Sequence, residues 1–355
     1  MIAPHNSFRL MWKGRAYSSH EDLKNLLEED PSHSSQWEID VLDFLSDWMD
    51  DSEYIELNTS GSTGTPKPIR LSKKTMIQSA QMTAKFLALQ SGNSALLCLP
   101  ARYIAGMMMI VRAYCNGWEL YCMEPRSIPS LFFHVDFAAM TPMQIHHLLT
   151  DAKQSIPIQT LILGGGVIPP QLEKLLLTLR NIHIFHTYGM TETASHIAMR
   201  KIGESYFQAL PGIQFYKDER SCLIVHAPML ELPPLYTNDI VELLNSQQFI
   251  WKGRIDNVIN SGGIKLYPEQ IEHKLQPLIK RPFFVMGVPD ERLGEKCVLI
   301  LEGMMDEPDI LELNASMRAI LSRYEMVKSC HFIPKFVRTL TGKISRKETA
   351  KLLEK

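Results

Sequence analysis

The chain has 355 residues, 45% of them hydrophobic, so it is long enough to bury the cores of two domains. Its 37 Lys and Arg residues nearly balance 39 Asp and Glu residues, and the formal net charge of −2 excludes a whole-protein field for nucleic acid or an anionic membrane. The six cysteines lack a CxxC or Cys/His ligand spacing, which argues against a zinc site or a disulfide framework.

Neither the N-terminus nor the longest apolar run predicts export or membrane insertion. The first ten residues have no apolar signal core, and the longest apolar run, residues 104–111, is far shorter than a membrane span. We therefore expect a cytoplasmic protein without membrane insertion.

Along the first 250 residues, short apolar runs alternate with segments of helical period, which is typical of an α/β domain. Strands are predicted at residues 95–99, 160–163 and 183–185. Two helices are predicted, one capped by Ser72 and one after Pro170, with these apolar faces: Met76, Ala80, Ala84 and Leu87, and Leu172, Leu175, Leu176 and Leu179.

After about Lys252 the pattern starts again on a smaller scale. Strands are predicted at residues 283–288 and 297–301, with one helix before and one after them. The apolar faces of these helices would comprise Ile271, Leu275 and Leu278, and Ile310, Leu313, Met317 and Leu321. We therefore expect α/β architecture with a large N-terminal domain, residues 1–254, and a small C-terminal α+β domain, residues 255–355.

Residues 59–67 contain the most informative local pattern, because seven of these nine residues are hydroxylic or glycine. Glycines let main-chain N–H groups turn toward a phosphate, hydroxyls add donors, and a lysine adds charge. A flexible polar loop is the plain alternative, and the GxxxxGK[ST] spacing of a P-loop is absent. The candidate phosphate ligands are Thr59, Ser60, Gly61, Ser62, Thr63, Gly64 and Lys67.

This segment resembles the phosphate loop of the adenylate-forming superfamily, which includes acyl-CoA synthetases, peptide-synthetase adenylation domains and luciferases. Other motifs similar to those of the superfamily follow in the same order, over roughly residues 54 to 350. They comprise the triplet Gly164, Gly165 and Gly166, against which a flat base could lie, and the segment Tyr188, Gly189, Met190, Thr191 and Glu192. The resemblance implies that Tyr188 stacks on adenine, Thr191 contacts phosphate and Glu192 holds Mg²⁺.

Further resemblances concern the ribose, the hinge and the second substrate. Asp239 and Arg254 match the two ribose contacts of the superfamily, although Asn238 stands where relatives have glycine, and we expect it to tolerate a left-handed backbone. Asp256 matches the interdomain hinge. Gly262 and Gly263 lie where the pantetheine arm of coenzyme A passes in relatives; relatives carry a lysine at Asn260, so the CoA contacts stay open.

Near the end of the chain, Lys343 matches the lysine that enters the active site in the first half-reaction. The resemblance implies an ATP-dependent acid:CoA ligase, in which the acid attacks the α-phosphorus of ATP and CoA then displaces AMP. Such a reaction brings anion to anion, so Lys343, Mg²⁺ and the phosphate loop would neutralise charge. Rotation of the C-terminal domain between the two steps would let one site carry out both of them.

The acid is predicted from finer similarities. Residues 253–257, 261–263 and 267–272 are most similar to those of o-succinylbenzoate:CoA ligases of menaquinone biosynthesis. An aromatic diacid needs a cation for its second carboxylate, for which Arg112 is the candidate; a surface arginine is an equal alternative. Tyr103 and Ser195 are also expected in the acid pocket. His196 could line it as well, but a structural role is favoured for this residue.

The sequence is also compatible with other functions. The chain could be a ligase for an aryl, fatty or amino acid, or an adenylation domain that loads a carrier protein. A regulatory nucleotide-binding protein with a decayed site is a non-enzymatic alternative, against which the presence of Lys343, Glu192 and Asp239 speaks. No nucleic-acid partner is predicted. The chain could form a homo-oligomer, and its oligomeric state stays open.

Overall fold

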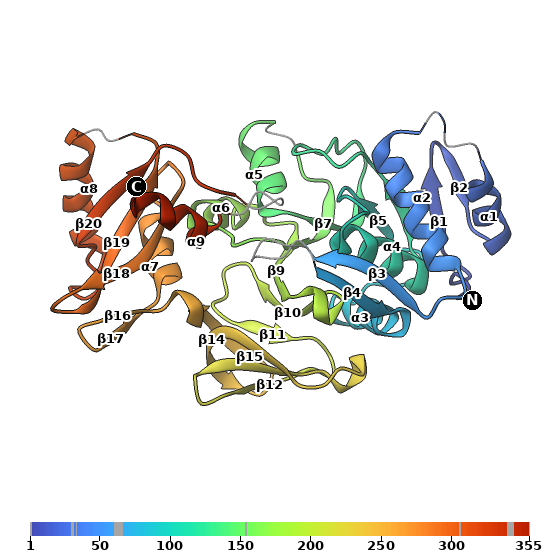
Figure 1. Ribbon diagram of the computed structural model, residues 1–355. Helices are drawn as coiled ribbons and strands as arrows, with labels where there is room; N and C mark the ends of the chain where they lie inside the picture. Colours follow the sequence, from blue (N-terminus) through green and yellow to red (C-terminus); the bar gives the residue numbers. More distant parts are fainter. Residues whose placement is uncertain are drawn as a thin grey trace.

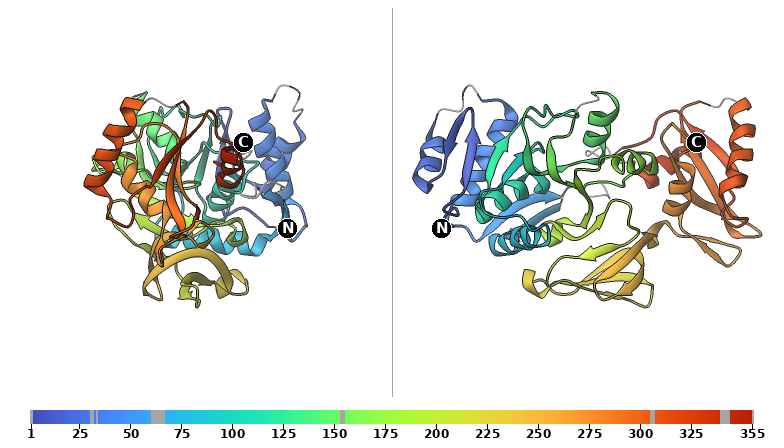
Figure 2. Two further views of the ribbon diagram at one scale, coloured as in Figure 1. Left: turned by 60° about the vertical axis from the view of Figure 1, so that its left-hand side comes forward. Right: turned by 180° about the vertical axis from the view of Figure 1, so that it is seen from behind.

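The computed structural model describes residues 2–29, 32, 34–59, 67–152, 155–304, 307–338 and 344–354. Two units lie side by side, a large one built on a mixed sheet and a smaller one at the C-terminus (Figure 1). The views in Figure 2 show the same separation from two other sides. The last strand of the large sheet ends at Arg254, and the smaller sheet begins at Ile259.

Thirteen strands of the described chain form the large sheet. Those from β9 to β1 are parallel neighbours, as expected where helices connect them, whereas the strands from β10 to β12 pair antiparallel. In spatial order they are β12 (Gln214–Lys217), β13 (Cys222–His226), β14 (Leu235–Asn245), β15 (Gln248–Arg254), β11 (Phe207–Ala209), β10 (His196–Lys201), β9 (His183–Gly189), β8 (Ile158–Leu163), β7 (Val135–Met140), β5 (Ser94–Leu97), β6 (Glu119–Cys122), β1 (Arg9–Trp12) and β2 (Arg15–Tyr17).

Helices cover both faces of the parallel strands, because successive residues of a strand point to opposite sides. In β5, Ala95 and Leu97 pack into the core formed with α3 and α4, whereas Leu96 packs into the core formed with α5 and α6. The helices of the large unit are α1 (His20–Glu28), α2 (Gln36–Met49), α3 (Lys73–Phe86), α4 (Ile104–Asn116), α5 (Pro142–Thr150) and α6 (Pro170–Leu176), with short 3₁₀ turns η2 (Thr191–Thr193), η3 (Pro228–Leu230) and η4 (Ile255–Asn257).

Local sequence explains where several helices begin. Ser72 accepts a hydrogen bond from Lys74 N at the start of α3, as predicted, and Thr141 and Gln144 form a reciprocal capping box at the start of α5. A strand not predicted from the sequence, β4 (Lys67–Ser72), pairs antiparallel with β3 (Tyr54–Thr59) and separates the glycine-rich segment from α3.

The smaller sheet also has two covered faces. Val285, Leu299 and Met317 belong to the core under α7 and α8, whereas Phe284 and Val298 pack on the other face, toward the C-terminal helix α9. Its elements are β16 (Ile259–Ser261), β17 (Ile264–Leu266), α7 (Pro268–Leu275), β18 (Phe283–Asp290), β19 (Gly294–Glu302), α8 (Glu307–Ile320), β20 (Ser329–Ile333), α9 (Arg346–Ala350) and η5 (Lys351–Glu354).

The predicted α/β class, with a smaller C-terminal sheet, is confirmed. Some details of the predicted helix faces are wrong. Leu175 lies on the exposed side of α6 and is 38% exposed. Four predicted face residues lie just beyond their helices: Leu87 after α3, Leu179 after α6, Leu278 after α7 and Leu321 after α8. These helices are shorter than the apolar spacing indicated, because apolar residues after a helix end can still contact the core.

The longest apolar run of the sequence lies in α4, whose residues Gly106 to Tyr114 are buried inside the large unit. Within the described ranges, no helix combines the length and the apolar character that crossing a membrane requires.

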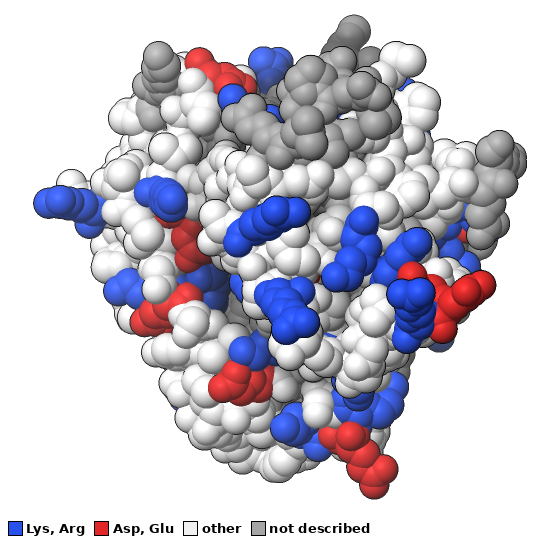
Figure 3. Space-filling model, turned by 90° about the vertical axis from the view of Figure 1, so that its left-hand side faces the viewer, with Lys and Arg blue, Asp and Glu red and all other residues white. Residues whose placement is uncertain are grey.

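The outward face of the smaller unit carries Lys and Arg mixed with Asp and Glu (Figure 3). Several basic residues near the C-terminus are already paired: Arg346 with Glu272, and Lys351 with Glu348. Part of the positive charge near the C-terminus is thus neutralised by the protein itself.

Candidate functional site

Asp239 lies where β14 and β15 run side by side, and side chains from two other strands contact it. Tyr188 Oη, at the end of β9, donates to Asp239 Oδ2 at 2.7 Å. Trp251 Nε1, on β15, donates to Asp239 Oδ1 at 3.0 Å. Arg254 is the cross-strand partner of Asp239, and its Nη1 lies 4.0 Å from Oδ1. The structure therefore brings together Tyr188, Asp239 and Arg254, which the sequence had placed at the nucleotide.

The Tyr188 ring is held by aromatic neighbours. Its centroid lies 5.1 Å from that of Phe249 in an edge-to-face arrangement and 5.8 Å from that of Phe207. Burial, together with the negative charge of Asp239, raises the pKa of Tyr188 well above its usual value. The phenol therefore stays protonated and remains a donor to the carboxylate.

Arg254 also contacts Asp256, the predicted hinge residue, through Nη2 and Oδ2 at 2.9 Å. Asn238 Nδ2 donates to both Asp256 oxygens, at 3.1 and 3.3 Å. Asn238 lies inside β14 and is not among the residues of positive φ, so the expected left-handed turn there is wrong. The asparagine side chain instead ties the segment after β15 to the large sheet.

The glycine triplet follows β8, next to the end of β9. A Cβ at Gly164 would lie 2.7 Å from Thr187 Oγ1, which itself donates to Leu163 O at 3.1 Å, so only glycine fits this approach. Gly165 has a φ of 81°. Gly165 and Gly166 are exposed with open space where a Cβ would be, which leaves a flat backbone surface beside β9.

Gly189 ends β9 and lets the next turn fold closely back on the strand. A Cβ on Gly189 would lie 2.4 Å from Ser195 O and 2.5 Å from His196 Cα. Ala194, in this turn, has a φ of 60°, which is uncommon for a residue with a Cβ. The turn between β9 and β10 is therefore tightly determined, and it carries residues 190–195 between the Asp239 cluster and α4.

The predicted phosphate and metal residues lie on this turn. Met190 N donates to Thr193 Oγ1 at 3.2 Å, and Thr191 and Glu192 follow in the 3₁₀ turn η2. Glu192 is exposed, and its carboxylate has no hydrogen-bond or ion-pair partner among the described residues. Within that part of the chain no group of three or more His, Cys, Asp and Glu side chains could hold a metal ion. A single free carboxylate suits Mg²⁺, which usually takes one or two protein carboxylates and completes its shell with phosphate and water.

Arg112, on α4, is 2% exposed, which excludes the alternative of a surface arginine. Its Nη2 donates to Ser195 Oγ and lies 3.5 Å from His196 Nδ1, and its Nε lies 3.4 Å from Thr83 Oγ1. Among the described residues, the other nitrogen, Nη1, contacts only the thioether of Met109, at 3.7 Å. The predicted pocket residues Arg112 and Ser195 are therefore in direct contact.

The partners of Arg112 are all neutral. No Asp or Glu among the described residues forms an ion pair with it, and burial lowers the pKa of its guanidinium to about 9. Holding an unpaired cation in a protein interior costs several kcal/mol. An anion that reached Nη1 would offset this cost.

Tyr103, the third predicted pocket residue, lies elsewhere. It precedes the first residue of α4, is 41% exposed, and its ring contacts the guanidinium of Arg102. Nine residues of helix separate it from Arg112 by about 13 Å. The structure therefore does not place Tyr103 and Arg112 in the same cluster.

Gly262 and Gly263 form the turn between β16 and β17, both with positive φ. Gly262 N donates to Leu293 O at 2.8 Å. The structure thus places the predicted pantetheine residues beside the loop that precedes β19, and not with the Asp239 cluster.

Two predicted elements lie outside the described residues: Lys343, and residues 60–66 of the phosphate loop, with Ser60, Gly61, Ser62, Thr63 and Gly64. The backbone on either side of that loop is described, and Thr59 and Lys67 are paired across β3 and β4. The bridge between Arg338 and Ile344 similarly brackets the segment that contains Lys343.

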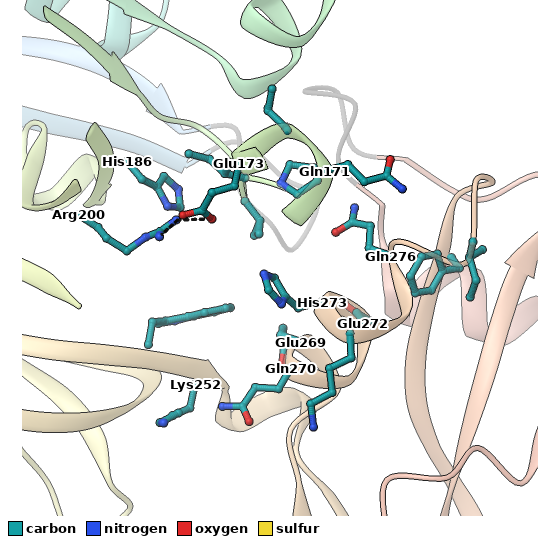
Figure 4. Close-up of a pocket in the computed structure, with 18 of the residues that line it drawn as sticks. Gln171, Glu173, His186, Arg200, Lys252, Glu269, Gln270, Glu272, His273 and Gln276 are labelled. Carbon is teal, nitrogen blue, oxygen red and sulfur yellow. Dashed lines mark hydrogen bonds and ion pairs between the residues drawn. The ribbon is translucent and has the colours of Figure 1, made fainter. Parts of the chain in front are cut away.

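A cavity of about 1050 Å³ separates the two units. One wall of the cavity contains His186 of β9 and an ion pair between Glu173 on α6 and Arg200 on β10, whose charged atoms lie 2.6 Å apart. Helix α7 forms the opposite wall (Figure 4). His186 Nε2 donates to Gly166 O at 3.0 Å, and burial together with the charge of Arg200 lowers the pKa of His186 to about 4. Trp251 lines this cavity as well as contacting Asp239.

Sequence reasoning missed Trp251, Thr83, Glu173 and Arg200, and it favoured a structural role for His196 over a place in the acid pocket. Trp251 lies three residues before Arg254, a spacing that simple strand alternation would place on the opposite face. The register shift between Ile240 and Val241 brings both residues to Asp239, and the sequence gives no signal for that shift. The other three carry no motif, and their partners come from distant segments.

Comparisons with known proteins agree on one family. The sequence profile of the AMP-binding enzymes matches residues 19–219. The 2-succinylbenzoate--CoA ligase of Salmonella typhimurium is 26% identical over 307 residues, which cover 81% of this chain and 66% of that protein. The ligase of Haemophilus influenzae is 27% identical over 327 residues, or 84% and 70% of the two chains. The chain thus spans about two thirds of the length of these curated relatives.

Solved structures show the same fold. An acyl-CoA synthetase (AMP-forming)/AMP-acid ligase II-like protein from Dyadobacter fermentans is 36% identical, with a TM-score of 0.61, over 93% of this chain and 98% of that one. The o-succinylbenzoate CoA synthetase of Bacillus subtilis in complex with OSB-AMP is 20% identical, with a TM-score of 0.69, over 82% and 68% of the chains.

Proposed function

The chain belongs to the AMP-binding, adenylate-forming enzyme family, and on this premise we propose that it is an AMP-forming acid:CoA ligase for an aromatic dicarboxylic acid, most simply o-succinylbenzoate. In the proposed reaction a carboxylate oxygen attacks the α-phosphorus of ATP and pyrophosphate leaves. The CoA thiol then attacks the acyl carbonyl and AMP leaves.

The observation that carries the proposal is the position of two different clusters at the two ends of one turn. Residues 189–195 join Tyr188, beside Asp239 and Arg254, to Ser195, which contacts Arg112. A nucleotide at the first cluster and an anionic acid at the second would meet near η2. Alignment of two bound reactants is the main requirement of this chemistry.

At the nucleotide end we propose that Asp239 accepts both ribose hydroxyls and that Arg254 assists it. Asp239 already accepts from Tyr188 and Trp251, but each carboxylate oxygen can accept a further hydrogen bond. Tyr188 and the exposed glycine surface of Gly165 and Gly166 would then flank the adenine.

Charge must be neutralised where the acid and the triphosphate approach each other. Mg²⁺, when bound, would supply positive charge to the phosphate oxygens, and Glu192 is the residue that would hold it, since its carboxylate is exposed and has no partner among the described residues. Lys343 and the loop from Thr59 to Lys67 are proposed to supply the remaining positive charge and donors.

At the acid end, Arg112 supports a substrate with a second carboxylate. Its guanidinium is buried among neutral groups and can bind a carboxylate through a fork of N–H donors. A monocarboxylic substrate would leave this cation without a counter-ion. The similarity to 2-succinylbenzoate--CoA ligases points to the same class of acid.

For the second step, the cavity between the two units is proposed to admit the acceptor thiol. It borders Trp251, on the wall next to Asp239, and is large enough for an extended pantetheine arm. The small unit would have to move between the two steps, which remains a prediction from the family.

A panel of acids in an ATP–pyrophosphate exchange assay tests this proposal. We expect exchange with o-succinylbenzoate, weaker exchange with its monoacid analogues, and consumption of the adenylate when CoA is added. Exchange with another acid would identify a different ligase, and an adenylate that reacts with a carrier protein but not with CoA would identify a loading domain. Inertness toward every acid would contradict an enzymatic role.

A further inference from the structure

The protonation of His196 follows from its hydrogen-bond partners. Thr83 Oγ1 lies 3.0 Å from Ser79 O, and a carbonyl oxygen only accepts, so the single hydroxyl proton of Thr83 is donated there. His196 Nε2 lies 2.9 Å from the same hydroxyl oxygen, which can then only accept. His196 must therefore carry its proton on Nε2.

This tautomer leaves His196 Nδ1 as an acceptor that faces Arg112. Ser195 Oγ lies 3.2 Å from Nδ1, and Arg112 Nη2 lies 3.5 Å from it. Burial, together with the charge of Arg112, lowers the pKa of His196 well below its usual value. A protonated imidazole would place a second cation against the guanidinium, so the neutral ring is the form that this arrangement requires.

Arg112 and its partners Thr83 and His196 belong to three separate elements. Thr83 belongs to α3, Arg112 to α4 and His196 to β10. Together, Thr83, Ser195 and His196 occupy the Nε and Nη2 side of the guanidinium. Within the described parts of the chain, Nη1 has only the weak sulfur acceptor of Met109. The arginine is thus fixed in orientation, its charge is not compensated, and one side has donors to spare.

We propose that His196 and Thr83 are positioning residues that set the specificity of the acid site: they hold Arg112 by neutral acceptors so that its Nη1 side binds the second carboxylate of the substrate. This inference rests on the proposed function. A purely structural cluster would gain nothing from a buried cation, because apolar residues of similar volume usually replace buried charges without loss of stability. A guanidinium held in advance loses less entropy when the carboxylate arrives.

The test uses two acids, o-succinylbenzoate and the analogue in which the carboxyl group that does not react is replaced by methyl. The measured quantity is the ratio of kcat/KM for the diacid to kcat/KM for the monoacid, in the complete enzyme with ATP, Mg²⁺ and CoA. His196→Leu removes the acceptor at Nδ1, and His196→Asn places an amide oxygen near the same position. Thr83→Val removes the hydroxyl, and Thr75→Val is the matched control.

The control lies on the same helix, is equally buried, and bonds Leu230 O at 3.1 Å, away from Arg112. We expect His196→Leu and Thr83→Val each to lower the ratio about tenfold, the loss of one hydrogen bond to a charged group. His196→Asn should restore a large part of the ratio, and Thr75→Val should not change it.

Equal loss with both acids, or no difference between His196→Leu and His196→Asn, would overturn the positioning role while leaving the proposed acid intact. A wild-type enzyme that shows no preference for the diacid would overturn the proposed acid, and with it this inference. The ¹⁵N NMR spectrum of the imidazole provides a measurement independent of activity. The signals of His196 are those that are present in the wild type and missing in His196→Asn. We expect a neutral ring with the proton on Nε2 at pH 6.5, and a cation or the other tautomer would contradict the proposal.

Discussion

Trp251 Nε1 donates a hydrogen bond to Asp239 Oδ1 at 3.0 Å, so the indole on β15 orients the carboxylate on the neighbouring strand β14. Tyr188 binds the other oxygen of the same carboxylate. Because both oxygens are fixed before any ligand arrives, Asp239 is prepared to accept two further hydrogen bonds in a defined direction.

Replacing Trp251 by Phe removes the N–H donor and keeps a large aromatic ring. We expect KM for ATP to rise about fivefold to tenfold, which corresponds to part of one charge-assisted hydrogen bond, with a smaller effect on kcat. Tyr216→Phe is the control, because Tyr216 bonds Gln214 and not Asp239. Steady-state kinetics at saturating acid and CoA measure the effect, and an unchanged KM would show that the indole does not orient Asp239.

Arg112→Ala should reduce the use of a diacid far more than the use of a monoacid. The buried guanidinium would lose its charge-assisted bonds to the second carboxylate, so the diacid-to-monoacid ratio of kcat/KM should fall on the order of 50-fold. Arg318→Ala, on the exposed side of α8, is the charge-matched control. If the preference between the acids does not change, Arg112 is not part of the acid pocket.

Gly189→Ala should destabilise the large unit by about 2 kcal/mol, because the new Cβ would overlap Ser195 O and the backbone of His196. Gly166→Ala is the matched control, since a Cβ there meets nothing within 4 Å and the φ of Gly166 is not positive. Urea denaturation of both variants measures the difference in the free energy of unfolding. Equal stability of the two variants would contradict the tight packing of the turn.

Glu272 provides a prediction on pH. Burial raises its pKa to about 7, although the charge of Arg346 and the hydrogen bond from Val285 N act in the opposite direction. A carboxyl group whose pKa is higher in the folded state binds more protons when folded, so its contribution to stability falls as pH rises from about 4.5 to about 7.

The Glu272→Gln variant cannot titrate at this position and should lack that part of the pH dependence. We expect the difference in unfolding free energy, wild type minus variant, to decrease between pH 5 and pH 7.5 in urea titrations. A difference that stays constant, or that increases with pH, would show that the pair with Arg346 keeps Glu272 ionised throughout.

Lys343→Ala should abolish adenylate formation and leave thioester synthesis from supplied acyl-adenylate largely intact, because the lysine is proposed to act only in the first step. Pyrophosphate exchange measures the first reaction, and release of AMP from the adenylate with CoA measures the second. Lys347→Ala removes one positive charge from exposed α9 and serves as the control. Equal losses in both reactions would refute the assignment.

The strands and helices were predictable because their signals are local. Alternating residues such as Ala95, Leu96 and Leu97 indicate a strand buried on both sides, and Ser72 marks a helix start from its own chemistry. The element β4 and the exposed side of α6 were misjudged, because pairing with β3 and the position of the core depend on distant residues.

The amino-acid sequence alone determined the family, the order of the motifs and the candidate contacts Tyr188, Asp239 and Arg254, since several short motifs resemble those of one family and follow in the same order. Only the tertiary structure decided that Arg112 is buried with no counter-ion among the described residues, that His196 faces it as a neutral acceptor, and that Trp251 orients Asp239. The physical reason is that burial, and with it the direction of a proton or the cost of a charge, is produced by segments far apart in the chain. Thr83 and His196 lie 113 positions apart, and no local pattern relates them.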